Sequence, residues 1–366
     1  MSPALEPAYT RSVDEGPGSG NQVTILIAFE LERNHTMNAA GIDVSAKTVT
    51  LVISREGRTG KPREFKNTPQ GHTALSNVLR KTRVTRVCLE ATGSYHLDLA
   101  VALDDAGLEV MVINPKAAKE FAGAMQTRSK TDAVDATLLA EFAQRMPFKP
   151  WERPDDLALG IRACARRIAA LNKQRTQTKN QLHAAQQTAL TPDFLLANLR
   201  HNIEYLDAQI EHLRQRVLDL IAADAHLQQS FDLLTSITGI AAASAIQLLG
   251  ELLVLPPDMK AKQWVALAGL DPQVHDSGSS VHKKPRLSKA GNRYLRIALY
   301  MPALSAASHN PHVRGYYRHL IADRGLKKIQ AVCAVMRKLL MAIHAMLKTR
   351  STFDSRRFYS LTETTA

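Results

Sequence analysis

The sequence predicts an α/β domain followed by a mostly helical remainder, and three observations support this division. Between residues 37 and 150, short apolar segments are interleaved with helical patterns, which is typical of a mixed sheet covered by helices. Over residues 151–230, apolar residues recur every three or four positions along two long stretches, which indicates paired helices. Over residues 231–350 the pattern is helical and strongly basic, so we expect a separate helical domain there.

The first domain is expected to alternate strands and helices, with Gly107 ending a helix and Pro115 ending a strand. The expected elements are two strands over residues 40–57, a strand over 63–67, a helix over 70–81, a strand over 86–92, a helix over 95–107, a strand over 108–115 and a helix over 130–144. Residues 1–36 are rich in Pro, Gly and Ser. We expect them to be a disordered leader or to precede a functional start at Met37. Within them, Val23–Phe29 is apolar enough for a further strand. The tail, residues 351–366, is polar.

The paired helices of residues 151–230 are expected to form an antiparallel coiled-coil arm or a dimerisation seam, joined by a turn at "LTPD" (190–193). Two ordinary core helices are the alternative, which the shortage of other apolar residues disfavours. The expected seam positions are Leu157, Ile161, Cys164, Ile168, Leu171, Thr178 and Leu182 on the first helix, and Ile203, Leu206, Ile210, Leu213, Val217 and Leu220 on the second.

Residues 233–252 have the pattern of helix, glycine hinge and helix. This resembles a helix-hairpin-helix element, in which backbone amides and a helix N-terminus hold a phosphate. The hinge here is Thr238-Gly239-Ile240-Ala241, and a simple helix pair explains the pattern equally well.

Charge is concentrated in the C-terminal third of the chain. The protein carries a net charge of +13, and the segment from Ser277 to Arg350 alone contains 15 Lys and Arg residues against a single acid, Asp323. A partner rich in phosphate explains this better than a solvated helical surface, because almost no acids are interspersed. The three cysteines show no metal or disulfide spacing, and neither a signal-peptide pattern nor a run of 18 apolar residues is present.

Four carboxylates in the first domain have positions that suit a metal site. Asp43 lies near the start of the first expected strand, Glu90 ends a later strand, and Asp132 and Asp135 lie three residues apart on one helix face. Carboxylates that converge repel each other unless divalent cations lie among them, and hard oxygen ligands suit Mg²⁺ or Mn²⁺. Two such ions could clamp the attacking and leaving oxygens of a phosphodiester, as at a ribonuclease H-like site.

A serine-rich turn, "SGSS" (277–280), directly precedes a basic segment. A linker would explain the serines but not the bases, and a plain nucleic-acid contact would explain the bases but not the serines. Ser288 follows in "RLSKAGN" and is expected to cap the next helix.

Several motifs occur in a fixed order: "GIDVSAKT", "CLEATGSY", "VINPKAAKEFA", "RSKTDAVDA", "LAGLDP", "SGSSVHKKPRLSKAGN" and "LRIALYMPAL". With them the chain resembles, over roughly residues 41–350, the bridge-RNA-guided insertion-sequence transposases of bacteria. These join a RuvC-like (RNase H-like) DEDD domain to a C-terminal serine transposase domain. The resemblance implies residues 37–150 as the DEDD domain, 151–230 as the arm and 231–350 as the transposase domain.

The resemblance implies that Asp43, Glu90, Asp132 and Asp135 are the metal-binding tetrad and that Ser277 is the nucleophile. Ser277 would attack a DNA phosphorus to give a phosphoserine link and a free 3′-hydroxyl, with Mg²⁺ or Mn²⁺ assisting at the carboxylates. Ser279 or Ser280 takes this role if the turn is shifted.

The resemblance also implies the partners: donor and target DNA, a structured bridge RNA that pairs with both, and further copies of the chain, as dimers that assemble to a tetramer, in a bacterial cytoplasm and at the nucleoid. No membrane is implied. Candidate DNA contacts are Lys283, Lys284, Arg286, Lys289, Arg293 and Arg296. Candidate RNA contacts, for which a solvated helix flank is an equal alternative, are Arg162, Arg166, Arg167, Lys173, Arg175 and Lys179.

Two other functions remain open from the sequence. A metal-dependent nuclease that resolves branched DNA by water attack would leave Ser277 structural and form no covalent intermediate. A non-catalytic nucleic-acid scaffold would be a decayed relative, which the presence of all four acids and the serine turn disfavours.

Overall fold

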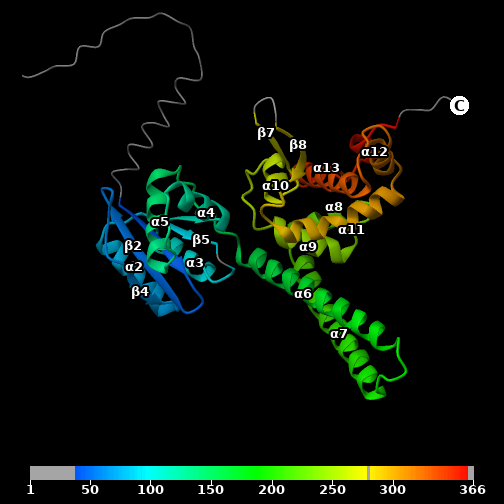
Figure 1. Cartoon of the computed structure of the whole chain (residues 1–366), viewed down its shortest axis with the longest axis horizontal. Coiled ribbons are helices and arrows are strands. Elements are labelled where there is room, and N and C mark those ends of the chain that lie inside the picture. Colours follow the sequence, from blue (N-terminus) through cyan, green and yellow to red (C-terminus); the bar gives the residue numbers. More distant parts are fainter. Residues whose placement is uncertain (1–37, 92, 278–280, 362–366) are drawn as a thin grey trace, which may run out of the picture. The chain divides into compact units, whose positions relative to one another are not determined.

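The computed structural model describes residues 38–91, 93–277 and 281–361, and for residues 274–277 and 281–285 it describes the backbone alone. The chain divides into two compact units, Met1–Arg153 and Pro154–Ala366, each with its own core (Figure 1). The expected leader, including Val23–Phe29, lies outside the described residues.

The first unit contains a mixed sheet, as the alternating pattern predicts. Its strands are β1 (Ala39–Val44), β2 (Thr48–Arg55), β3 (Arg58–Thr59), β4 (Arg63–Lys66), β5 (Arg86–Glu90) and β6 (Glu109–Ile113). The strand order is β3-β2-β1-β5-β6, and β4 also pairs with β2. The strands β1 to β4 pair antiparallel, whereas β1, β5 and β6 run parallel, so an antiparallel half adjoins a parallel half.

Four helices accompany the sheet in the described part of the first unit. They are α2 (Pro69–Lys81), α3 (Leu97–Asp105), α4 (Pro115–Ala124) and α5 (Asp132–Arg145). Because side chains alternate along a strand, Ile42 and Leu89 face one core with the apolar residues of α2 and α3. Cys88 and Met111 face the other core with Leu139 of α5.

The second unit is almost entirely helical. Its elements are α6 (Asp156–Ala185), α7 (Asp193–Ala222), α8 (Ala225–Thr235), α9 (Ala242–Leu252), α10 (Ala261–Leu267), β7 (Pro272–Ser277), β8 (Val281–Leu287), α11 (Arg293–His309), α12 (Pro311–Ala322), α13 (Lys328–Thr349) and α14 (Ser355–Phe358). One core cluster includes buried residues from α6 through α14.

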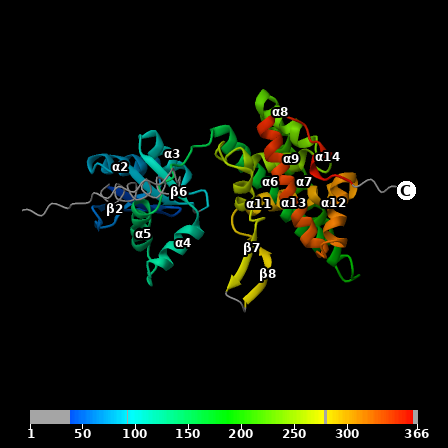
Figure 2. The ribbon, with the colours of Figure 1, turned by 90° about the horizontal axis from the view of Figure 1, so that it is seen from above.

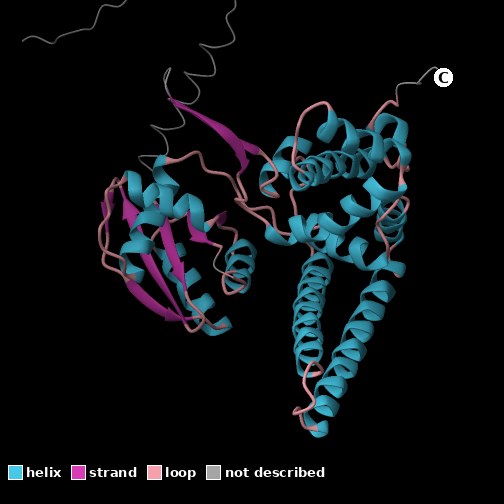
Figure 3. Cartoon of the chain, turned by 45° about the vertical axis from the view of Figure 1, so that its right-hand side comes forward, coloured by secondary structure: helices cyan, strands magenta, loops and turns pink. Residues whose placement is uncertain are grey.

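The helices α6 and α7 are the two long paired helices, and they meet at a short loop (Figure 3). Ile161, Ile168 and Leu206 of the expected seam are buried within this chain's own core, so this part of the seam packs within one chain. The expected register is wrong at its end: Leu220 is 38% exposed, and Ile221 is buried instead. A straight helix repeats every 3.6 residues, which brings the fourth residue after Val217 back to the core.

The expected glycine hinge lies between α8 and α9. Gly239 has φ +97°, and a Cβ there would lie 2.8 Å from the carbonyl oxygen of Pro302 and 2.9 Å from Cβ of Ser305. The close packing of α11 against this turn, together with the positive φ, requires glycine here, without any contribution from a phosphate ligand.

The helix α13 has the length and apolarity of a membrane span, with a mean hydropathy of 1.4. Eight of its residues, among them Val335, Leu339 and Ile343, are buried in the core of the second unit. This burial is the arrangement of a core helix.

Candidate active site

The four predicted carboxylates belong to one face of the sheet in the first unit. Asp43 is two residues beyond Gly41 on β1, and Glu90 is two residues beyond Cys88 on β5, so both point to the face that α5 covers. Asp132 and Asp135 lie in the first turn of α5, where the hydroxyl of Thr131 accepts from the amide of Val134. The helix N-terminus favours negative charge, so α5 accommodates both of its acids there.

The other three acids affect the pKa of Asp43. Asp43 is half-buried, and burial, followed by the negative charges of Asp132, Asp135 and Glu90, raises the pKa of its carboxyl to about 6. Each of the three is therefore close enough to disfavour ionisation of Asp43. The structure thus places all four carboxylates that the sequence singles out at the α5 side of the sheet, near enough for their charges to act on Asp43.

Gly41 sets the distance between β1 and α5. A Cβ at this position would lie 2.0 Å from the carbonyl oxygen of Ala136 and 2.2 Å from the amide nitrogen of Ala140. The small residues of α5 therefore rest directly on the strand backbone. This close approach places the first turn of α5 beside the end of β1, and a larger residue would separate the two pairs of acids.

The donor set and its electrostatics fit a hard divalent cation. All four ligands are carboxylate oxygens, and their mutual repulsion is what a cation would relieve. Within residues 38–91, 93–277 and 281–361, no group of three or more His, Cys, Asp and Glu side chains is arranged so that it could hold a metal ion. Metal binding would therefore require the four side chains to draw closer together.

The predicted nucleophile belongs to the second unit. The strands β7 and β8 pair antiparallel as a β-hairpin, and Ser277, the last residue of β7, is in register with Val281. Ser279 and Ser280 lie outside the described residues. Figure 2 shows the hairpin extending away from the helices of its unit.

The foot of this hairpin is held by polar contacts. Asn292, not Ser288, caps α11: its side-chain oxygen accepts from the amides of Tyr294 and Leu295. The expectation for Ser288 is wrong because α11 begins only at Arg293, and the Ser288 hydroxyl instead donates to Asp271 at 2.5 Å.

The six candidate DNA contacts follow the hairpin into α11. Lys283, Lys284 and Arg286 belong to β8. Arg286, Lys289 and Arg293 are exposed, whereas Arg296 is half-buried and donates to the carbonyl oxygen of Ala268 at 2.8 Å. Arg296 therefore has a role within the fold.

The six candidate RNA contacts on α6 fall into two groups. Arg167, Lys173 and Lys179 are exposed, which leaves them available to a polyanion. Arg175 pairs with Asp207 of α7 at 2.6 Å, so it joins the two helices of the arm.

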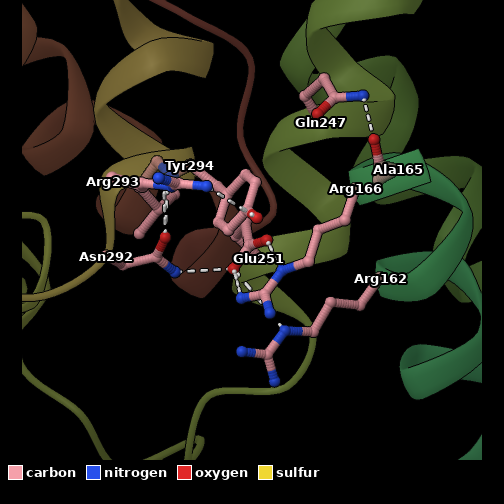
Figure 4. A network of polar contacts seen from close by, with 9 residues as sticks. Arg162, Ala165, Arg166, Gln247, Glu251, Asn292, Arg293 and Tyr294 are labelled. Atoms are coloured by element: carbon pink, nitrogen blue, oxygen red, sulfur yellow. Dashed lines mark hydrogen bonds and ion pairs between the residues drawn. The ribbon is translucent and has the colours of Figure 1, made fainter. Parts of the chain in front are cut away.

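Arg162 and Arg166 converge on Glu251, a buried carboxylate of α9 (Figure 4). Arg166 donates to both carboxylate oxygens, at 2.7 and 2.9 Å, and its guanidinium lies 4.5 Å from the centre of the Tyr294 ring. Nε of Arg162 lies 3.6 Å from the carboxylate, as an ion pair. The side-chain amide of Asn292 completes the set with a 2.6 Å hydrogen bond to Glu251.

This network joins the base of the arm to the foot of the hairpin, and the sequence interpretation missed it. Burial, followed by the charge of Arg166, lowers the pKa of Arg162, while Glu251 acts in the opposite direction. The available signal was a single acid inside the apolar run "QLLGELL" (247–253), because a buried carboxylate needs charged partners.

Solved structures of RuvC from Thermus thermophilus are similar to part of this chain. One is RuvC in complex with a Holliday junction substrate, with 19% identity and a TM-score of 0.26, covering 31% of this chain and 99% of that one. The other is RuvC alone, with 20% identity, a TM-score of 0.25 and the same coverage. At TM-scores this low the fold description rests on the strand order itself.

Curated relatives cover most of the sequence. The pilin gene-inverting proteins of Moraxella lacunata and Moraxella bovis are 29% and 28% identical, each over 86% of this chain and 97% of their own length. The insertion element IS110 uncharacterized 43.6 kDa protein of Streptomyces coelicolor is 24% identical over 71% of this chain and 80% of its own.

Two family models match separate parts of the chain. Residues 40–189 match the IS110 DEDD transposase model, and this segment contains the four carboxylates. Residues 231–318 match the transposase model of the IS116/IS110/IS902 family, which includes the hairpin and Ser277. Over these two segments the chain is therefore similar to the transposase domains of the IS110 family.

Proposed function

We propose that this protein is a DNA recombinase of a bacterial insertion sequence that cuts and rejoins donor and target DNA through a phosphoserine intermediate. The observation that carries the proposal is the gathering of Asp43, Glu90, Asp132 and Asp135 on the α5 face of the sheet, in a chain with two transposase domains. The gene-inverting relatives support recombination as the outcome.

In the proposed reaction Oγ of Ser277 attacks a DNA phosphorus. The new Oγ–P bond replaces the P–O3′ bond, and the 3′-oxygen leaves with the proton that the serine gives up. One phosphodiester is exchanged for another, so the bond energy is retained for rejoining without ATP. Attack by the 3′-hydroxyl of the partner strand reverses the exchange and releases the serine.

Asp43, Glu90, Asp132 and Asp135 are the residues that would hold Mg²⁺ or Mn²⁺. When bound, such ions stabilise negative charge on the phosphate oxygens and on the leaving oxygen. These acids would fix the position of such ions, and Gly41 sets how closely the backbone of α5 approaches β1.

Exposed positive charge supports the proposed partners. The exposed cations Arg286 and Lys289 at the hairpin and Arg293 at the start of α11 would bind DNA phosphates. The exposed Arg167, Lys173 and Lys179 of the arm would bind the structured guide RNA that the family resemblance implies, in which case base pairing supplies sequence choice. The protein then acts as an oligomer in the bacterial cytoplasm, at the nucleoid.

The decisive experiment looks for DNA attached covalently to protein. Purified protein, Mg²⁺, the RNA encoded beside the gene, and labelled donor and target DNA are combined, denatured and separated on a gel. We expect an adduct with wild type and with Asp104→Asn, an exposed acid of the same unit outside the carboxylate group. The adduct should be lost with Ser277→Ala and with Asp43→Ala.

A nuclease that uses water instead of serine is the competing function, and the low-scoring similarity to RuvC does not favour it. It predicts cleavage that needs Asp43, survives Ser277→Ala and never yields an adduct. An adduct that survives Ser277→Ala but is lost with Ser279→Ala or Ser280→Ala would shift the nucleophile within the turn. Strand exchange that is unaffected by any of these substitutions would contradict both enzymatic functions.

A further inference from the structure

A hollow of about 590 Å³ lies between α4 and α5 of the first unit, and two of the four carboxylates line it. Glu90 and Asp135 form one side, so the hollow is continuous with the candidate active site. Its volume is within the range of small-ligand sites, which is roughly 300–1,000 Å³. The carboxylate function described above does not use this space.

The walls of the hollow are apolar and partly aromatic. Ile113 and Leu139 are buried residues of its floor, while Phe121 of α4 and Phe142 of α5 meet edge to face with ring centres 5.1 Å apart. No residue of α4 between Pro115 and Ala124 is fully buried, so this helix covers the hollow without filling it. Such walls accept a flat, apolar-faced group by stacking.

The remaining lining residues are cationic. Lys119, Arg128 and Lys130 line the hollow and are exposed to solvent. A purely apolar ligand would offer no anionic group to these three cations. A nucleotide presents a flat base to the walls and phosphates to the cations. Thr127 and Ser129 add hydroxyls that can bond to the edge of a base.

We propose that the hollow between α4 and α5 binds an unpaired nucleobase of the DNA strand whose phosphate lies at Glu90 and Asp135. The base stacks on Phe121, and Arg128 and Lys130 contact the neighbouring phosphates. Removing one base from the stack exposes the phosphate beside it to the carboxylate group. The inference rests on the proposed function, because only a DNA substrate brings a strand to these acids.

The test uses photochemical cross-linking of the full-length chain. Single-stranded DNA containing 5-iododeoxyuridine is bound in the presence of Ca²⁺, irradiated, and the attached peptides are identified by mass spectrometry. Fluorescence anisotropy measures the affinity for the same DNA independently. We expect a cross-link in the peptide that contains Phe121.

Two variants of α4 provide a matched pair. Ala122 lines the hollow and Ala124 does not, so Ala122→Phe fills the space whereas Ala124→Phe adds the same ring to an exposed position. Ala122→Phe should reduce the Phe121 cross-link about tenfold, the range expected for loss of one stacked base, while Ala124→Phe leaves it unchanged. Phe121→Leu keeps apolar packing but removes the ring and should abolish this cross-link, which guards against misfolding of Ala122→Phe.

The outcomes separate the two proposals. If wild type does not bind DNA at all, the proposed function fails and the inference fails with it. If DNA binds but cross-links map only to the second unit, or Ala122→Phe changes nothing, the hollow is not a base site and the recombinase proposal stands. A Phe121 cross-link obtained with 5-iodouridine RNA and not with DNA would assign the hollow to RNA and overturn the inference.

Discussion

At position 41 a side chain even as small as that of alanine has no room. The Gly41→Ala variant must push α5 away from β1, because the added carbon would lie 2.0 Å from a backbone oxygen of that helix. We expect a loss of about 1–3 kcal/mol in the free energy of unfolding, as for overpacked cores, together with loss of the covalent DNA adduct.

The control for this variant is Gly160→Ala on α6. Gly160 has no neighbouring atoms within 4 Å of an added Cβ and sits in a helix, where alanine is favoured by about 0.5–1 kcal/mol. Thermal denaturation of both variants measures the difference. Wild-type stability and adduct yield in Gly41→Ala would contradict the spacing role of this glycine.

Asp43 should make the stability of the metal-free protein depend on pH. Its folded-state pKa is about 6, above the ordinary value of 3.8. An acid whose pKa is raised by folding stabilises the fold while protonated, and this contribution is lost as the pH rises from about 3.8 through about 6. At about pH 8 the free energy of unfolding of Asp43→Asn should therefore exceed that of wild type by on the order of 1–3 kcal/mol, and its melting temperature should be higher. Near pH 4 the two proteins should not differ.

Melting curves at a series of pH values, in the presence of a chelator, measure this effect. Added Mg²⁺ should stabilise wild type at about pH 8 more than it stabilises Asp43→Asn. Asp104→Asn is the control and should show no such pattern. Equal melting temperatures of wild type and Asp43→Asn across the whole pH range would show that burial and the neighbouring acids do not raise the pKa of Asp43.

Single residues differ in how well their roles could be predicted from the sequence. The strand positions of Asp43 and Glu90 were predictable, because each lies in a short apolar segment that reads as a strand without knowledge of the fold. The cap of α11 was not, since Ser288 and Asn292 are both good capping residues and only the point where the helix begins decides between them. The partners of Glu251 were hidden because they lie 85 and 89 residues before it in the chain.

Among the elements, the strands and helices of the first unit follow their sequence patterns closely. The strand-and-turn signals of residues 40–57 correspond to β1 and β2, and the helix expected over 130–144 is α5. The β7–β8 hairpin was not expected as strands, because a run such as "HKKPRL" (282–287) lacks the alternation of a half-buried strand.

Removal of the Glu251 carboxylate should destabilise the second unit strongly. Glu251→Ala leaves the guanidinium groups of Arg162 and Arg166 half-buried without their counter-charge, and breaking a buried pair in this way costs about 3–5 kcal/mol. Chemical denaturation followed by circular dichroism measures the loss. Glu211→Ala is the matched control: it breaks an exposed pair with Arg214 on α7, which is worth about 0–1 kcal/mol.

For the whole molecule, the tip of the arm is the surface we expect to mediate assembly. The seam between α6 and α7 is closed within one chain, yet Leu190 and Phe194 at the tip are 90% and 77% exposed, and Leu195 beside them is 41% exposed. Large apolar side chains gathered in this way mark contact surfaces. The tip is therefore a part of the arm that suits contact with a second copy.

Phe194→Ser combined with Leu190→Ser should lower the oligomeric state, measured by light scattering coupled to size-exclusion chromatography. Ile329→Ser, which changes an exposed apolar residue on α13 (54% exposed), should leave the oligomer intact. Wild-type mass in the tip variant, or a monomeric wild type, would contradict assembly through the tip.

The Glu251 network also has a practical consequence for protein engineering. The same carboxylate is bound by Arg162 and Arg166 near the start of α6 and by Asn292, which caps the helix that follows the hairpin. An arm grafted from a relative without both arginines would leave Glu251 without these partners, and would thereby also weaken the contact of Glu251 with Asn292 that holds the end of the hairpin. Chimeras should therefore exchange the arm together with α9 and the residues around Asn292, as one module.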